Sequence, residues 1–309
     1  MAFYLVTGGC GFIGSHLADG LVADGHRVRI LDDLSTGKRN NAPGAAEIVI
    51  GDVADAAVAR AAINGVDGCF HLAAVASVAR ANEAWAGTHR VNLTGAINIF
   101  DAARTARSGG PVPVVYVSSA AVYGDNDAVP LAEDAATQPL TAYGADKLGC
   151  ELHARVAHAV HGVPVMGFRF FNIYGPRQDP SSPYSGVISI FIERIGAGDA
   201  IDIHGDGEQV RDFVYVRDAV RFLRRGMERR KGEPRVYNVC TGAPISINAL
   251  AALLCKVAGR TVEIRHVDAR PGDIRISIGD GSRAGAELDI RPETAIEAGL
   301  ADTVQSLIG

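Results

Sequence analysis

The feature that most constrains the fold is the alternation of short, largely apolar segments with helical segments in the first half of the chain. The apolar runs lie at residues 3–6, 28–31, 48–50, 68–72, 113–117 and 164–170. Helical periodicity separates several of them, at residues 14–23, 91–103 and 142–161. Strands that are apolar on both sides are typical of a parallel sheet covered by helices on both faces. The sequence therefore predicts an α/β fold with a Rossmann-type doubly wound parallel sheet.

The regular alternation ends near residue 172. Residues 176–186 are rich in Pro, Ser and Gly and predict a loop, whereas residues 247–257 predict a helix. We expect a first domain over residues 1–172, with returning segments near 208–240. A smaller α/β C-terminal lobe would comprise residues 173–207 and 241–309.

Composition excludes several classes of protein. The 30 basic and 35 acidic residues give a net charge of −5, so no basic field is available for a nucleic-acid backbone. The five scattered cysteines form no C-x-x-C pair and no zinc-type cluster, so no metal site is expected, and they suit a reducing cytoplasm. No signal peptide and no run of 18 apolar residues is seen. We therefore expect a cytoplasmic protein without nucleic-acid or membrane partners.

A glycine-rich turn follows the first apolar run. Gly8, Gly11 and Gly14 lie between this run and the first helix, where a pyrophosphate can approach the free N–H groups of the helix N-terminus. Asp32 ends the second run, 18 residues after Gly14, and an acid there favours NAD over NADP by binding the ribose hydroxyls. Asp52 closes the third run and is a candidate for the adenine amino group. The pattern predicts NAD as the cofactor.

A second set of residues predicts acid–base chemistry. Tyr143 and Lys147 are four residues apart on a predicted helix, so their side chains share one face. A lysine ammonium beside a phenol favours the phenolate, which can act as a general base toward a sugar or alcohol hydroxyl. Ser119 ends an earlier apolar run and supplies a hydroxyl for the same proton.

Together these motifs resemble the extended short-chain dehydrogenase/reductase family, and within it the nucleotide-sugar 4-epimerases of the UDP-glucose (UDP-galactose) 4-epimerase type. The resemblance covers nearly the whole chain. It is carried by residues 7–14, 31–34, 51–53, 71–74, 92, 118–124, 143–147, 169–172, 175–178, 205–216 and 270–273.

The resemblance implies a tightly held NAD and an inversion at C4 of a UDP-hexose through a transient 4-keto sugar. Tyr143 would take the O4 proton, Ser119 would hydrogen-bond O4, and Lys147 would also hold the nicotinamide ribose. The implied cofactor-binding residues are Gly8, Gly11, Phe12, Ile13, Gly14, Asp32, Asp33, Asp52, Val53, Leu72, Ala73, Ala74, Asn92, Tyr143, Lys147 and Phe170.

The substrate residues are also implied by the resemblance, with residues 1–172 as the NAD-binding domain and the C-terminal lobe as the substrate-binding part. Arg211 and Arg270 would bind the diphosphate, for which a planar guanidinium is suited. The full set of substrate-binding residues is Ser119, Tyr143, Asn172, His204, Arg211, Arg270, Asp273 and Ser277. Ser277 occupies a place that resembles a gate beside the C2 substituent. Because serine is small, we expect room for UDP-GlcNAc and UDP-GalNAc as well as UDP-Glc and UDP-Gal.

Two alanines separate this reaction from related ones. Family dehydratases and decarboxylases resemble this chain but carry acid–base residues at the places of Ala120 and Ala121, and alanine transfers no proton. A simple inversion at C4 is therefore favoured over a dehydratase or decarboxylase, while a UDP-glucuronate 4-epimerase and a reductase of the same family remain alternatives. A non-catalytic NAD-binding protein is the third hypothesis. The helices at residues 93–106 and 148–160 resemble the family's helix bundle, so a homodimer is expected.

Overall fold

The computed structural model describes residues 1–180, 186–229, 233–269 and 272–309. The chain forms two compact units. The first comprises Met1–Gly124, Thr137–Arg169 and Val220–Tyr237, and the second comprises Asp125–Ala136, Phe170–Ala219 and Asn238–Gly309. Compared with the predicted boundaries, residues 125–136 and 208–219 cluster with the second unit. The roles assigned to the two domains stay predictions.

A seven-stranded sheet forms the centre of the first unit, in the order β11-β6-β5-β4-β1-β2-β3. Its strands are β1 (Phe3–Thr7), β2 (Arg27–Asp32), β3 (Glu47–Ile50), β4 (Gly68–His71), β5 (Val114–Ser119), β6 (Val165–Phe170) and β11 (Arg235–Val239). Strand β1 pairs in parallel with both β2 and β4, and the pairs β2–β3 and β4–β5 are also parallel. The strand order thus reverses at β1, which confirms the predicted doubly wound sheet. In sheets of this kind, ligands bind at the carboxyl ends of the strands, beside the point where the order reverses.

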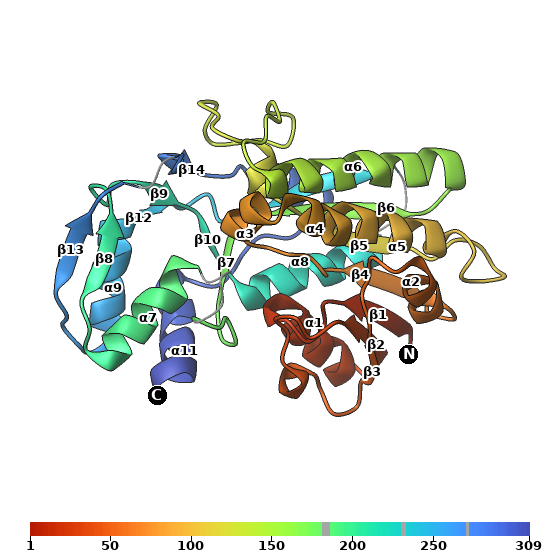
Figure 1. Cartoon of the computed structure of the whole chain (residues 1–309), viewed down its shortest axis with the longest axis horizontal. Helices are drawn as coiled ribbons and strands as arrows, with labels where there is room; N and C mark the ends of the chain where they lie inside the picture. Colours follow the sequence, from red (N-terminus) through yellow and green to blue (C-terminus); the bar gives the residue numbers. More distant parts are fainter. Residues whose placement is uncertain (181–185, 230–232, 270–271) are drawn as a thin grey trace. The chain divides into compact units, whose positions relative to one another are not determined.

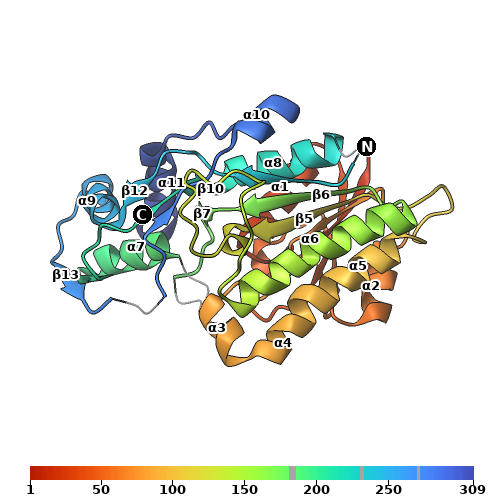
Figure 2. The ribbon, with the colours of Figure 1, turned by 90° about the horizontal axis from the view of Figure 1, so that it is seen from above.

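Helices cover both faces of this sheet. On one face pack α2 (Ala56–Ile63), α5 (Gly95–Ala103) and α6 (Ala142–His161), whose buried side chains form one core cluster with β4, β5 and β6. Figures 1 and 2 show α5 and α6 side by side along this face. The other face carries α1 (Phe12–Ala23) and α8 (Val216–Arg229), where Phe222 meets Phe168 of β6 edge to face. Both faces of the sheet are therefore covered by helices, as the largely apolar strands predict.

Helix α6 has clear start and stop signals. The Thr141 hydroxyl accepts a hydrogen bond from the Gly144 N–H at the N-terminus, and Gly162 takes a left-handed conformation, φ 66°, at the C-terminus. The segment before α5 differs from the predicted continuous helix 91–103. After the short helices α3 (Val78–Glu83) and α4 (Trp85–His89), Arg90–Thr94 forms a π-helical turn (η2), and α5 begins at Gly95. Such turns often occur at functional sites.

The second unit is built from short strands. Its sheets pair β7 (Asn172–Tyr174) with β10 (Phe213–Tyr215), and β8 (Ile201–His204) with β13 (Ile264–Val267). A third sheet has the order β12-β9-β14, from Ile245–Ser246, Val210–Arg211 and Ile276–Ser277. The helices are α7 (Val187–Ala197), α9 (Ile247–Ala258), α10 (Ser282–Glu287) and α11 (Ile296–Ile308), and α9 agrees with the helix predicted at 247–257. The 3₁₀ turns of the chain are η1 (Arg39–Asn41) and η3 (Ala120–Val122).

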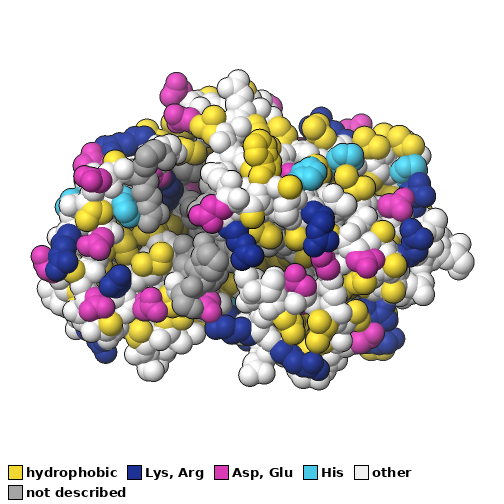
Figure 3. Space-filling model, in the orientation of Figure 1, with side chains coloured by type: hydrophobic (Ala, Val, Ile, Leu, Met, Phe, Trp, Pro, Cys, Tyr) yellow, Lys and Arg dark blue, Asp and Glu magenta, His cyan; other side chains and the backbone are white. Residues whose placement is uncertain are grey.

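Acidic and basic side chains are interspersed over the surface seen in Figure 3. Across the described ranges, no helix has the length and apolar character needed to span a membrane. Within the same ranges, no group of three or more His, Cys, Asp or Glu side chains could hold a metal ion. All five cysteines are free thiols, and Cys255 is the one among them that is not fully buried.

Candidate active site

The glycine-rich turn of the first unit is closely packed at the carboxyl end of β1. Gly8 has φ +71°, and a Cβ there would lie 2.9 Å from the Ala73 nitrogen. A Cβ on Gly14 would lie 2.1 Å from the Gly8 carbonyl oxygen, which itself accepts the Gly11 N–H at 3.1 Å. Both positions therefore require glycine, because any side chain would push the turn apart.

This turn leads directly into α1. Gly11 is the N-cap residue and offers no side-chain cap, and the first turn, with Phe12, Ile13 and Gly14, holds no acidic residue. The N–H groups at the start of α1 therefore receive no cap from the side chain of the N-cap residue, and they carry the positive end of the helix dipole. These residues fit the pyrophosphate of NAD.

Asp32 lies beside the turn at the end of β2. Its Oδ2 accepts the Cys10 N–H at 2.9 Å and its Oδ1 accepts the Leu34 N–H at 2.9 Å, and the residue is 7% exposed. Burial raises the pKa of this carboxyl, and the two backbone N–H bonds oppose the shift. Asp33 caps the next turn by accepting the Ser35 N–H and hydroxyl. The glycine turn and Asp32 are thus joined by one direct hydrogen bond, from the Cys10 N–H.

The predicted cofactor-binding residues that follow β3 and β4, and Asn92 beside them, mostly contact other residues of the protein. Asp52 accepts the Ala54 N–H at 2.8 Å and pairs with Arg90, so its carboxylate already has partners where an adenine contact was predicted. Val53 is buried. Asn92, 1% exposed and inside the π-turn, accepts the Val75 N–H at 2.7 Å and donates to the Val75 carbonyl at 3.1 Å. Asn92 therefore holds the chain that follows β4, where Ala74 lies.

Leu72 and Ala73 meet the glycine turn through Thr7. The Thr7 hydroxyl oxygen accepts both of their N–H groups at 3.1 Å, and it lies 2.8 Å from Nδ1 of His71. With two bonds accepted, the hydroxyl hydrogen is left to donate to His71, whose ring proton is thereby assigned to Nε2. Burial, aided by the charge of Lys147, lowers the pKa of His71 to about 3, so its ring is neutral at working pH.

Ser119, Tyr143 and Lys147 gather where β5 ends and α6 begins. Ser119 ends β5 and its Oγ accepts the Ala121 N–H at 3.2 Å, so its hydroxyl hydrogen can still donate. Lys147 is 4% exposed, and its Nζ donates to the Val117 carbonyl at 2.8 Å and lies 5.7 Å from the centre of the Tyr143 ring. A fixed ammonium beside a phenol is the arrangement that general-base chemistry needs.

The turn after Ser119 touches the first turn of α6. A Cβ on Gly144 would lie 2.6 Å from the Ala121 carbonyl oxygen, so glycine lets the two backbones meet. Ala120 and Ala121 themselves form the 3₁₀ turn that carries the chain past Ser119. Their methyl groups can neither give nor accept a proton.

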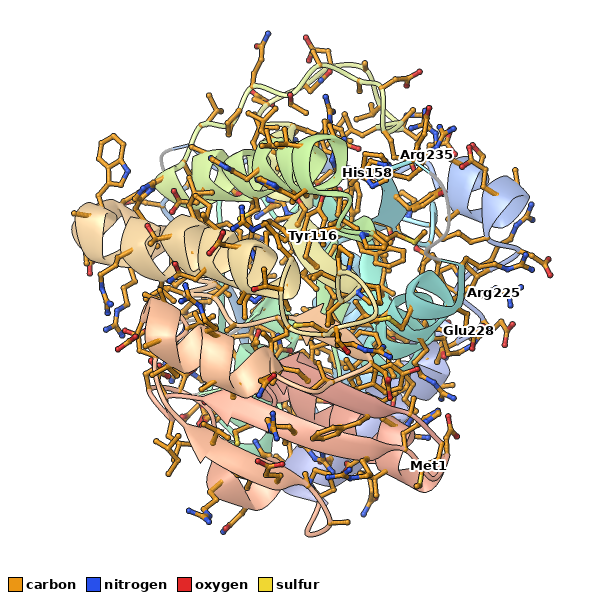
Figure 4. The ribbon with its side chains drawn as sticks, turned by 90° about the vertical axis from the view of Figure 1, so that its right-hand side faces the viewer. Met1, Tyr116, His158, Arg225, Glu228 and Arg235 are labelled. Carbon is orange, nitrogen blue, oxygen red and sulfur yellow. The ribbon has the colours of Figure 1, made fainter. Side chains whose placement is uncertain are left out.

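A buried ion pair supports this arrangement, and it was not predicted from the sequence. Glu151, one turn after Lys147, accepts the Ser118 hydroxyl at 2.5 Å and both Nε and Nη2 of Arg169, at 2.9 and 2.8 Å. Both charged side chains are at most 5% exposed. Tyr116, also on β5, lies in the interior in Figure 4, between Gly167 of β6 and Phe100 of α5. Charged residues within strand and helix patterns are the signal that could have revealed the pair.

In the second unit, three predicted substrate residues lie together. Arg211 on β9 pairs in register with Ser277 on β14, and its Nη2 donates to Oδ1 of Asp273 at 2.5 Å. The Arg211 side chain is 16% exposed, and burial lowers the pKa of its guanidinium while Asp273 opposes the shift. Asp273, one of the predicted substrate-binding residues, is therefore a partner of the predicted diphosphate-binding arginine.

The other predicted residues of this unit are placed separately. Asn172 begins β7 and its Nδ2 donates to the Asp212 carbonyl at 2.9 Å. His204 ends β8, with Nδ1 3.0 Å from the Asp268 carbonyl oxygen. Phe170, predicted to contact the cofactor, is a buried residue at the end of β6 and clusters with this second unit. Arg270 lies outside the described residues.

Comparisons with known proteins agree with this reading of the chain. The model of the NAD dependent epimerase/dehydratase family matches residues 4–240. A UDP-glucose 4-epimerase of Mycolicibacterium smegmatis is 37% identical, over 97% of both chains. The structure of a UDP-glucose 4-epimerase from Thermotoga maritima with UDP-glucose gives a TM-score of 0.94 at 35% identity, over 98% of both chains.

A second structure has a similar likeness. It is a UDP-N-acetylglucosamine 4-epimerase from Methanobrevibacter ruminantium in complex with UDP-N-acetylmuramic acid, with a TM-score of 0.93 at 35% identity over 99% of this chain and 98% of that one. The predicted family and its cofactor are thereby confirmed: the chain belongs to the NAD dependent epimerase/dehydratase family.

Proposed function

We propose that this chain is an isomerase, an NAD-dependent nucleotide-sugar 4-epimerase that inverts C4 of a UDP-hexose through a 4-keto sugar. The observation that carries the proposal is the cluster of Ser119, Tyr143 and Lys147 in the first unit, next to a 3₁₀ turn (Ala120–Val122) that begins with the methyl side chains of Ala120 and Ala121. Such a cluster can take the proton from one hydroxyl oxygen of a substrate and later return it.

The chain's residues would act on the hydroxyl at C4. The Tyr143 oxygen would accept the O4 proton and later return it, while the Ser119 hydroxyl would donate to O4 and orient it. Lys147 would stabilise negative charge on the phenol, held in place by its bond to the Val117 carbonyl. When bound at the glycine turn and Asp32, NAD supplies the acceptor and donor of the C4 hydride.

The substrate end would be held by the second unit. Arg211 would bind the UDP diphosphate and Asn172 would contact the diphosphate or sugar, with Asp273 near the ribose and His204 near the uracil. Ser277, in register with Arg211, is small. We propose on this basis that UDP-Glc, UDP-Gal, UDP-GlcNAc and UDP-GalNAc are all accepted.

The direct test is to incubate the purified protein with each of these four sugars and with UDP-glucuronate, without added NAD, and to read the C4 configuration by NMR. We expect inversion of the neutral hexoses and, more slowly or equally, of the N-acetylated pair. Inversion of UDP-glucuronate alone would replace the proposal with a uronate 4-epimerase. Inversion of the hexoses without the N-acetylated pair would contradict the size argument at Ser277.

We also propose that the protein is a cytoplasmic homodimer. Leu152, Val156 and Val160 follow one another at four-residue spacing on α6, so they form one apolar stripe, and each is at least half exposed. Sedimentation should give twice the monomer mass for the natural chain and a monomer for Leu152→Glu/Val156→Glu. A monomeric natural chain would contradict the dimer.

A further inference from the structure

A buried aspartate in the second unit joins the segments that hold the proposed substrate residues. The Asp212 side chain is 0% exposed. Its Oδ1 accepts the Thr241 N–H at 2.8 Å and the Thr241 hydroxyl at 2.6 Å. Its Oδ2 accepts the Gly242 N–H at 2.8 Å and the Gly279 N–H at 3.4 Å. All four partners are donors, so the site requires an acceptor-only group, which an ionised carboxylate is.

The backbone of Asp212 binds two further segments. Its N–H donates to the Ser277 carbonyl at 3.1 Å. Its carbonyl accepts both the N–H and the side-chain Nδ2 of Asn172, at 3.1 and 2.9 Å. Arg211 is its chain neighbour. One buried residue is thus bonded to, or adjacent to, three of the residues that the proposed function assigns to substrate.

We infer that Asp212 is a positioning residue for the nucleotide-sugar diphosphate, an inference that rests on the proposed function. Its carboxylate ties the 241–242 and 279 loops to β9, and its backbone ties β9 to Asn172 and Ser277. Loss of the negative acceptor would release the 241–242 and 279 loops from β9, so β9, with Arg211 and its backbone partner Asn172, would be held less firmly. Affinity for a nucleoside diphosphate would fall, while proton transfer at Tyr143, which belongs to the first unit, would continue with bound substrate.

The chain offers a matched control in Asp218. This aspartate is also buried, at 2% exposed, and it also accepts backbone N–H groups, from Glu293 at 3.1 Å and Thr294 at 2.9 Å. Neither Glu293 nor Thr294 is among the residues assigned to substrate. Asp218→Asn therefore reproduces the structural cost of a lost carboxylate in the same unit without disturbing the proposed binding residues.

The experiment compares the wild-type protein with Asp212→Asn, Asp218→Asn and the milder Thr241→Val, which removes one bond to Oδ1. UDP itself is the probe, titrated by calorimetry, and KM, kcat, bound NAD and thermal unfolding are measured alongside. We expect Asp212→Asn to raise the UDP Kd and the KM at least tenfold, and Thr241→Val to raise them about fivefold. Bound NAD and kcat should stay within about twofold of wild type.

Asp218→Asn should lower the unfolding temperature like Asp212→Asn but leave the UDP Kd unchanged. Wild-type UDP affinity in Asp212→Asn, or in Thr241→Val should Asp212→Asn fail to fold, would overturn the inference. An equal loss of UDP affinity in Asp218→Asn would show that Asp212 has only a structural role, and this result would also overturn the inference. Absence of UDP binding by the wild-type protein would contradict the proposed function, and the inference with it.

Discussion

The two units support their site residues in different ways. In the first unit the residues lie at the ends of strands of four to six residues, braced by helices on both faces. In the second unit they lie on strands of two to four residues. Such short strands form few backbone hydrogen bonds with their neighbours. Side-chain hydrogen bonds such as those of Asp212, together with the Arg211–Asp273 ion pair, hold the segments in place instead.

The comparison separates two tasks. Proton transfer needs groups placed to within a fraction of an ångström, and the first unit provides this with buried supports such as Glu151 and the Val117 carbonyl. Binding a flexible diphosphate tolerates more adjustment, and short strands linked by polar side chains are sufficient. Changes in the first unit should therefore affect turnover, NAD retention and stability, and changes in the second unit should affect substrate affinity.

The largest effect is expected from Tyr143→Phe. Removal of the phenolic oxygen takes away the proposed base, so kcat should fall by about 10³-fold or more. UDP affinity and bound NAD should stay close to wild type, because the ring remains. The measurements are steady-state epimerisation and UDP calorimetry, and a variant with unchanged kcat would remove Tyr143 from the mechanism.

Glu151→Gln should strongly destabilise the protein. The change leaves the Arg169 guanidinium buried without its counter-ion, which costs about 3–5 kcal/mol. Urea unfolding would measure the loss. Glu228→Gln is the matched control, since Glu228 pairs with Arg225 at the surface at 3.4 Å and should lose less than about 1 kcal/mol. Equal losses in the two variants would show that the buried pair gives no special support.

Gly14→Ala should selectively weaken NAD retention. The added Cβ would lie 2.1 Å from the Gly8 carbonyl oxygen, so the turn must open. We expect bound NAD, measured by absorbance after denaturation, to fall at least tenfold, a loss of about 1.4 kcal/mol or more. On the same helix, a Cβ on Gly20 meets its nearest atoms at 3.7 Å, so Gly20→Ala should retain NAD and gain about 0.5–1 kcal/mol of stability. Full NAD retention in Gly14→Ala would contradict the proposed role of the glycine turn in NAD binding.

The smallest effect is expected in the second unit. Arg211→Lys keeps the charge but loses the fork of donors that suits a diphosphate, so KM should rise about tenfold at nearly constant kcat. The split between KM and kcat from steady-state kinetics checks this. A fall in kcat with constant KM would break the proposed division between the two units.

Much of the first unit could be predicted from sequence because its signals are local. The apolar runs, the glycine spacing and the four-residue interval from Tyr143 to Lys147 each lie within one segment. The π-turn around Asn92 was not predicted, because it depends on contacts with Val75, 17 residues away. The Glu151 network was not predicted for the same reason, since Ser118 is 33 residues distant.

The structure of the second unit has weaker signals in the sequence. The predicted loop at 176–186 and helix at 247–257 follow from composition and periodicity, but strands of two residues have too few side chains to show alternation. Arg211, Asp273 and Ser277 were reached through family resemblance. The bonds of Asp212 span 29 to 67 residues and have no counterpart in a local pattern.

The central claim is that one proton relay, without a second acid–base group, inverts C4. The measurement that tests it most directly is epimerisation of UDP-galactose in D₂O, followed by NMR and mass spectrometry of the sugar. The account predicts UDP-glucose with hydrogen retained at every ring carbon, because the C4 hydride leaves and returns without contact with solvent. Deuterium bound to a ring carbon, or a sugar that is not inverted, would contradict it.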